Sequence, residues 1–113
     1  MLKILLVEDN NALRRAMKTG LEATGKVEVI GEAASGEDAL KLCQTGEVSG
    51  DHRSHDLAGL EAILMDVHLA GEMNGIQAAV AIRRELPRLP VVFYSIQDDD
   101  AYYRDFLRSG ILS

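Results

Sequence analysis

Short apolar runs that end in oxygen-bearing polar residues are the feature that most constrains how this chain can fold. The runs and the polar residues that follow them are 2–7 with Glu8 and Asp9, 62–65 with Asp66, and 90–94 with Ser95. Segments with helical spacing of apolar residues separate the runs, a pattern typical of parallel strands joined by crossover helices. Ligands bind beyond the carboxyl ends of such strands. We therefore expect these polar side chains to meet at one edge of a sheet.

The remaining segments alternate regularly between strand and helix patterns. A fourth strand is predicted at 27–31, and its outward alternation of Glu28 and Glu32 is typical of a sheet edge. The predicted helix starts are Asn10 or Asn11, then Ser35, then Asn74 with Gly75, and last Asp98, and the predicted stops are Gly25 and Pro87. In the first helix an apolar stripe is predicted at Leu13, Ala16, Met17 and Leu21. The polar stretch 45–59 has no periodicity and is predicted to be an insertion or a mobile loop.

Composition limits the classes of protein to which the chain can belong. Its 113 residues fit one domain, 1–113, and its formal charge of −6 disfavours nucleic-acid binding by this segment. The pair Arg83-Arg84 is predicted to be a solvated helix face. No stretch approaches the ~20 apolar residues of a membrane span, so we expect a cytoplasmic protein without membrane contact. Cys43 is the single cysteine, which excludes an intrachain disulfide, and we expect it to pack as a small hydrophobe.

The predicted crevice has the chemistry of a magnesium site beside a nucleophile. Mg²⁺ prefers hard oxygen ligands and keeps several waters, so two carboxylates and a carbonyl suffice. We expect Asp9 and Asp66 to bind it directly, Glu8 to act directly or through water, and the backbone carbonyl of His68 to complete the set. A carboxylate such as Asp66 can also attack phosphorus to give an aspartyl phosphate. The hydroxyl of Ser95 is placed to donate to a phosphoryl oxygen.

Three other readings of the sequence are disfavoured. Residues 31–36 resemble a degraded dinucleotide fingerprint, but Ala33 replaces its middle glycine and Ser35 already explains a helix start. His52 and His55 lie in a polar loop without a cysteine, so a zinc site is not expected. A phosphatase of the haloacid dehalogenase type would need a second acid two residues after Asp66, where the chain has histidine.

At these residues the chain resembles the receiver domains of two-component response regulators, the chemotaxis-Y-like superfamily. The resemblance rests on residues 4–9 (ILLVED), 63–69 (ILMDVHL), 73–76 (MNGI) and 91–95 (VVFYS). It implies that Glu8 and Asp9 bind the metal, that Asp66 is the phosphoacceptor, and that Ser95 senses the phosphoryl group. His68 and Gln97 take the variable positions that influence the lifetime of the aspartyl phosphate in the family.

The resemblance also implies the fold and the partners. We expect an α/β, flavodoxin-like, doubly wound parallel sheet of strand order 2-1-3-4, and a histidine kinase or phosphotransfer protein as phosphodonor. The chain is expected to be a switch that assists its own phosphorylation and not a stand-alone enzyme. We expect it to stop before the family's fifth strand, which carries a lysine, and before the last helix, and therefore to form a homodimer or self-associate. A receiver-like interaction module that works without phosphate is the alternative.

Overall fold

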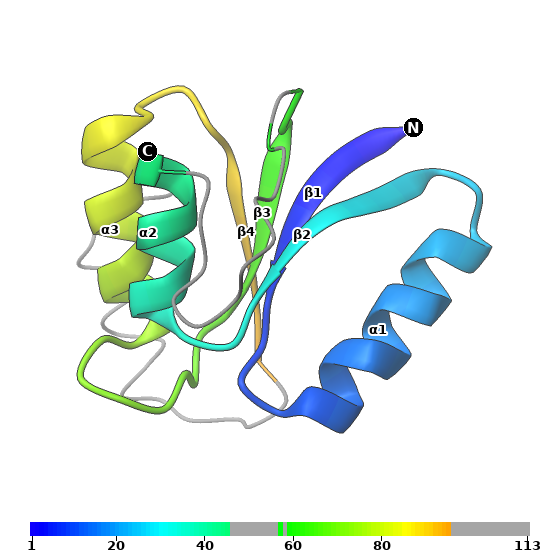
Figure 1. Cartoon of the computed structure of the whole chain (residues 1–113), viewed down its shortest axis with the longest axis horizontal. Coiled ribbons are helices and arrows are strands. Elements are labelled where there is room, and N and C mark those ends of the chain that lie inside the picture. Colours follow the sequence, from blue (N-terminus) through cyan, green and yellow to red (C-terminus); the bar gives the residue numbers. More distant parts are fainter. Residues whose placement is uncertain (46–56, 58, 96–113) are drawn as a thin grey trace.

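The computed structural model has three layers, with a parallel sheet between helices (Figure 1). It describes residues 1–45, 57 and 59–95. The elements of this part of the chain are β1 (Leu2–Val7), α1 (Asn11–Ala23), β2 (Val27–Ala33), α2 (Gly36–Thr45), β3 (Ala62–Asp66), α3 (Gly75–Glu85) and β4 (Val91–Tyr94). All paired strands are parallel and lie in the order β2-β1-β3-β4. This confirms the predicted flavodoxin-like arrangement.

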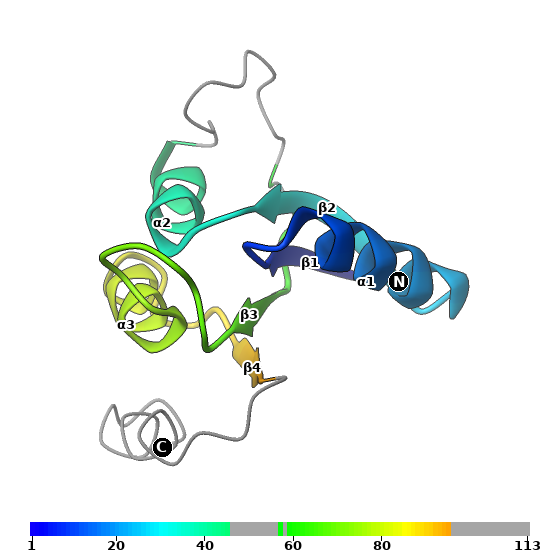
Figure 2. The same cartoon turned by 90° about the horizontal axis from the view of Figure 1, so that it is seen from below.

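Strands β1 and β3 form the buried centre of the sheet. Leu5, Leu6 and Val7 of β1 are fully buried, as are Ile63 and Met65 of β3. Helices α2 and α3 pack together on one face, whereas α1 lies on the other (Figures 1 and 2). Continuous apolar runs are what strands need when helices cover both of their faces. The parallel strands with crossover helices that the runs predicted, and the doubly wound layout that the resemblance implied, are therefore confirmed.

Two strand boundaries differ from the sequence prediction. Strand β2 continues two residues past Gly31, because Glu32 and Ala33 still pair with β1 and the Glu8 N–H donates to the Ala33 carbonyl at 3.0 Å. Glu32 is tolerated in this edge strand since it lies beside the basic side chains of α1. Strand β4 begins at Val91, one residue after the start of the run 90–94 that predicted it, and ends at Tyr94.

Side-chain caps begin each helix where the sequence indicated. Asn10, rather than Asn11, caps α1 through an oxygen that accepts the Leu13 N–H at 3.0 Å. Ser35 caps α2 through its hydroxyl oxygen. Asn74 caps α3 in a complete capping box, in which the side chain and backbone N–H of the cap are both bonded to the third helical residue. These caps orient each helix just beyond the end of a strand.

Helix α1 is anchored less deeply than the other two helices. None of its residues is buried. Met17 and Leu21 of the predicted stripe pack half-buried against the sheet, whereas Ala16 is exposed. Val92 of β4 lies on the same sheet face, in register with Leu64, and is 54% exposed. Within the described residues, α1 is the one helix on this face, and it covers the side of β1 and β2 (Figure 2).

Cys43 and the predicted basic pair have defined places. Cys43 packs half-buried against the core, where burial raises the pKa of its thiol to about 11, so the prediction of a small hydrophobe is confirmed. Arg84 is exposed as predicted. Arg83 is half-buried instead, and its guanidinium donates to the Pro87 carbonyl at 3.2 Å. Of the pair Arg83-Arg84, only Arg84 therefore lies on the solvated face of α3 that the sequence predicted.

Several predictions fall outside the described residues. They concern most of the stretch 45–59, the zinc reading of His52 and His55, Gln97, the helix beginning at Asp98 and the segment 110–113. They stay predictions. Within the described residues, no helix is long and apolar enough to cross a membrane.

Candidate functional site

The ends of β1 and β3 bring three acidic side chains together. Val7 pairs with Met65, so the next residues of the two strands lie side by side at the edge. One carboxylate oxygen from each of Glu8, Asp9 and Asp66 lies within 4.8 Å of the others. Glu8 and Asp66 are 1% and 5% exposed, and Asp9 is half-buried. The predicted meeting of these carboxylates is confirmed.

Backbone amides of the following loops hold each of these carboxylates. The hydrogen bonds run from Asn10 N–H to Glu8 Oε2 at 2.9 Å, from His68 N–H to Asp66 Oδ1 at 2.9 Å, and from Ala70 N–H to Asp9 Oδ2 at 3.1 Å. Such bonds fix the orientation of a carboxylate. They do not cancel its charge. The cluster therefore concentrates negative charge in fixed positions.

The electrostatics of the cluster favour a bound cation. Burial raises the pKa of Glu8 above its ordinary value of 4.5, and the neighbouring Asp9 and Asp66 raise it as well. The hydrogen bonds from the Asn10 N–H and the Tyr94 hydroxyl lower this pKa but do not outweigh the rise. Burial and the same carboxylates raise the pKa of the Tyr94 phenol, so it stays protonated and can donate. A divalent cation would relieve the mutual repulsion of these groups. Three hard oxygen donors fit Mg²⁺.

Ser95 and His68 lie at the same sheet edge. Ser95 directly follows Tyr94, which pairs with Asp66, and its side chain is exposed. His68 is half-buried two residues beyond Asp66. The part of its carbonyl as a metal ligand and the contact of Ser95 with a phosphoryl group stay predictions.

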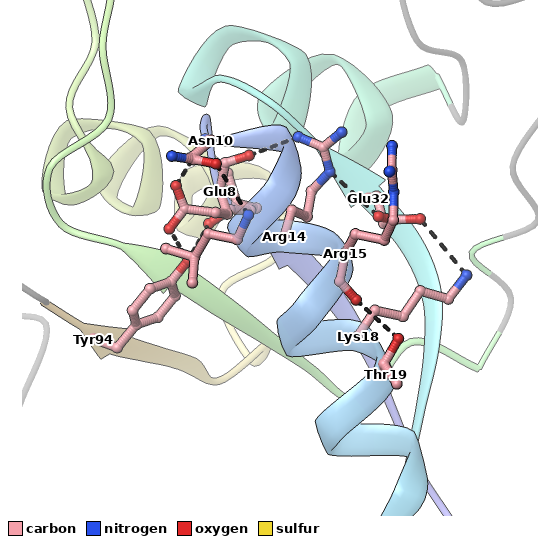
Figure 3. A network of polar contacts seen from close by, with 10 residues as sticks. Glu8, Asn10, Arg14, Arg15, Lys18, Thr19, Glu32 and Tyr94 are labelled. Carbon is pink, nitrogen blue, oxygen red and sulfur yellow. Dashed lines mark hydrogen bonds and ion pairs between the residues drawn. The ribbon is translucent and has the colours of Figure 1, made fainter.

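Two residues that the sequence reasoning did not assign to the site contact it directly (Figure 3). The Tyr94 hydroxyl lies 2.9 Å from Glu8 Oε1 and 3.1 Å from the Val7 carbonyl oxygen. The Arg14 guanidinium donates to the Glu8 backbone carbonyl at 2.8 Å and pairs with Glu32 at 3.2 Å. Tyr94 could have been suspected, since a tyrosine at the end of a buried strand needs a partner for its hydroxyl. Arg14 carries no comparable sequence signal.

The fold and the site together define an α/β protein with an acidic cluster, at the carboxyl edge of its sheet, that could hold a cation. A more specific class follows from comparison with known families. The family described as response regulator receiver domain matches residues 4–113. This chain belongs to that family, as its resemblance implied.

Individual relatives are consistent with this membership. The chain is 36% identical over 115 residues to the transcriptional regulatory protein LiaR of Bacillus subtilis (strain 168), an alignment that covers 100% of this chain and 47% of LiaR. It is 32% identical over 103 residues to the response regulator protein VraR of Staphylococcus epidermidis (strain ATCC 12228 / FDA PCI 1200), covering 89% of this chain and 43% of VraR. The chain thus spans about half the length of these curated relatives.

Solved structures agree on the architecture. The signal receiver domain of the putative response regulator NarL from Mycobacterium tuberculosis superposes with a TM-score of 0.71 at 25% identity, over 96% of this chain and 77% of that one. A DNA-binding response regulator of the LuxR family from Staphylococcus aureus superposes with a TM-score of 0.75 at 20% identity, over 97% and 81%, which bears on the fold alone.

Proposed function

We propose that this receiver domain accepts a phosphoryl group on Asp66 from a histidine kinase or phosphotransfer protein, with Mg²⁺ held by Glu8, Asp9 and Asp66. The observation that carries the proposal is the convergence of these carboxylates within 4.8 Å at the end of β3. Membership of the receiver family supports the same chemistry. The Mg²⁺ set, with the His68 carbonyl as a further ligand, and the cytoplasmic location are parts of the proposal.

The transfer is a displacement at phosphorus by an oxygen of Asp66. The new O–P bond forms as the P–N bond of the donor's phosphohistidine breaks, and the electron pair leaves with the imidazole nitrogen. The His68 N–H donates to Asp66 Oδ1 at 2.9 Å and so helps to fix the orientation of the attacking carboxylate. Glu8 and Asp9 would hold Mg²⁺ beside Asp66, where its positive charge would offset the repulsion between the carboxylate and the incoming phosphoryl group.

The other residues convert the modification into a signal. The Ser95 hydroxyl donates to a phosphoryl oxygen and so couples β4 to the state of Asp66. A phosphoryl group that binds one arrangement of the surface better than another shifts the population between the two arrangements. The domain is thus a switch that assists its own phosphorylation and not a stand-alone enzyme. Its self-association stays a prediction.

Substitution of the acceptor tests the assignment. With Mg²⁺ and a radiolabelled small acyl phosphate as donor, the protein is expected to incorporate base-labile phosphate, and Asp66→Asn is expected to abolish it. Asp38→Asn, in the first turn of α2, is the matched control because it removes an aspartate on another element. Label that persists in Asp66→Asn would overturn the acceptor assignment.

Beryllofluoride separates this function from the alternative of a phosphate-independent interaction module. As a phosphoryl mimic it is expected to bind at Asp66 only in the presence of Mg²⁺, seen as shifts in the amide signals of His68 and Ser95 in NMR spectra. Absence of Mg²⁺-dependent binding, in a protein that is folded, would favour the interaction module.

A further inference from the structure

Tyr94 bridges the two strands that supply the acids. Its backbone carbonyl accepts the Val67 N–H at 3.0 Å, next to Asp66 on β3. Its side chain passes over the end of β3 to β1, where the hydroxyl lies 2.9 Å from Glu8 Oε1 and 3.1 Å from the Val7 carbonyl oxygen (Figure 3). The hydroxyl has one proton for these two acceptors, and the charged carboxylate is both the nearer and the stronger one.

Packing into the core does not explain the position of this side chain. Side chains alternate along a strand, and the core-facing positions of β4 are Val91 and Phe93, which pack against the cluster under α2 and α3. Tyr94 shares the opposite face with Val92, which is 54% exposed. Tyr94 therefore lies outside the core cluster beneath α2 and α3, and its hydroxyl contacts at the acidic site help to fix the half-buried ring.

Glu8 needs this second contact more than the two aspartates do. A glutamate has one more rotatable bond than an aspartate, so fixing its carboxylate costs more conformational entropy. Asp9 and Asp66 each accept a backbone N–H from the loop that follows β3. Glu8 is held at both oxygens, by the Asn10 N–H at 2.9 Å and by the Tyr94 hydroxyl at 2.9 Å. With both contacts, the longer side chain is held beside the two aspartates.

We propose that Tyr94 is a positioning residue of the cation site: its hydroxyl fixes the Glu8 carboxylate in the arrangement that binds a divalent cation. The proposal rests on the proposed function, in that the acidic cluster must bind Mg²⁺. Tyr94 acts through Glu8 and does not itself bind the cation. Loss of a residue that hydrogen-bonds to a metal ligand typically weakens metal binding by roughly 10- to 100-fold.

Calorimetric titration with Mg²⁺ tests the role of Tyr94. We expect Tyr94→Phe, which keeps the ring and removes the hydroxyl, to weaken Mg²⁺ binding roughly 10-fold. Thr19→Val is the matched control, because it removes a hydroxyl that hydrogen-bonds to the Arg15 carbonyl at 3.0 Å on α1, away from the acids. Circular dichroism establishes that each variant is folded before titration.

A double-mutant cycle separates positioning from general weakening of β4. If Tyr94 acts through Glu8, then Tyr94→Phe should change Mg²⁺ affinity little in a Glu8→Gln background. An equal loss in both backgrounds would overturn the positioning role, as would an unchanged affinity in Tyr94→Phe alone. A wild-type protein that binds no Mg²⁺ would overturn the proposed metal site together with this inference. Failure of the metal site is thus distinguished from failure of the positioning role of Tyr94 alone.

Discussion

Gly75, the first residue of α3, lies so close to the end of β3 that a methyl group has no space there. A Cβ atom on Gly75 would overlap the carbonyl oxygen of Asp66, and would lie 2.9 Å from the Asp66 carbonyl carbon and 3.0 Å from the Val67 Cα. The Gly75 N–H also donates to the Val67 carbonyl at 3.2 Å. These neighbours are backbone atoms, so no side-chain rotation relieves the overlap.

The cost of Gly75→Ala follows from this geometry. Overpacking a tight site costs about 1–3 kcal/mol, and rigid backbone neighbours place this substitution at the upper end. The better helix propensity of alanine opposes the loss by up to about 1 kcal/mol. We expect the free energy of unfolding to fall by about 2 kcal/mol, which corresponds to a Tm lower by about 10 °C. Mg²⁺ affinity should fall as well, because the displaced backbone carries Asp66.

Urea unfolding followed by circular dichroism measures this effect against a matched control. Gly20 on α1 has no atom within 4 Å of a built Cβ. Gly20→Ala should therefore raise the free energy of unfolding by about 0.5–1 kcal/mol through helix propensity and chain entropy alone. If Gly75→Ala proved as stable as Gly20→Ala, the close approach of α3 to β3 would not be the constraint that we infer.

Two further predictions concern the pH dependence of stability and the start of α3. The pKa of Glu8 is raised in the folded protein, so between its ordinary value of 4.5 and the raised value the folded state binds more protons than the unfolded state. The contribution of Glu8 to stability should therefore fall as pH rises through that window in metal-free protein. Urea unfolding at several pH values measures this, because the free energy of unfolding of Glu8→Gln should rise relative to that of the wild-type protein as pH rises. A difference that does not change with pH would contradict this reasoning. Asn74→Ala removes the cap of α3 and should lower the free energy of unfolding by about 1 kcal/mol. Asn11→Ala, at the exposed start of α1, should change it by less than about 0.5 kcal/mol. Equal effects of the two substitutions in thermal unfolding would refute the role of the capping box.

The sheet and its acids could be predicted because their signals are local. An apolar run such as 62–65 identifies a buried strand, and parallel strands place the residues after them at a common edge. Asp66 and Asp9 follow directly from that rule. The cap of α1 was confined to Asn10 or Asn11 by the same local logic, since a capping side chain must lie just before the first helical turn.

The contacts of Tyr94 and Arg14 could not be predicted in this way. Which side chain crosses from β4 to β1 depends on strand register and on the direction of the ring, and neither is encoded in a local pattern. The extension of β2 through Glu32 likewise involves partners distant in the chain, because its backbone pairs with β1 and its side chain pairs with Arg14, 18 positions earlier, at 3.2 Å. Each of these features depends on partners that are brought close only by the fold.

The low burial of α1 has a consequence for local opening of the folded protein. Helix α1 has no buried residue of its own and packs on the sheet mainly through Met17 and Leu21, so its partial opening should require less free energy than global unfolding. Its amide protons should accordingly exchange with solvent long before those of β1. Asn10 and Arg14, at the start of this helix, bind the side chain and the backbone of Glu8, respectively. Each opening of α1 would then release these contacts to Glu8 while the central strands stay folded.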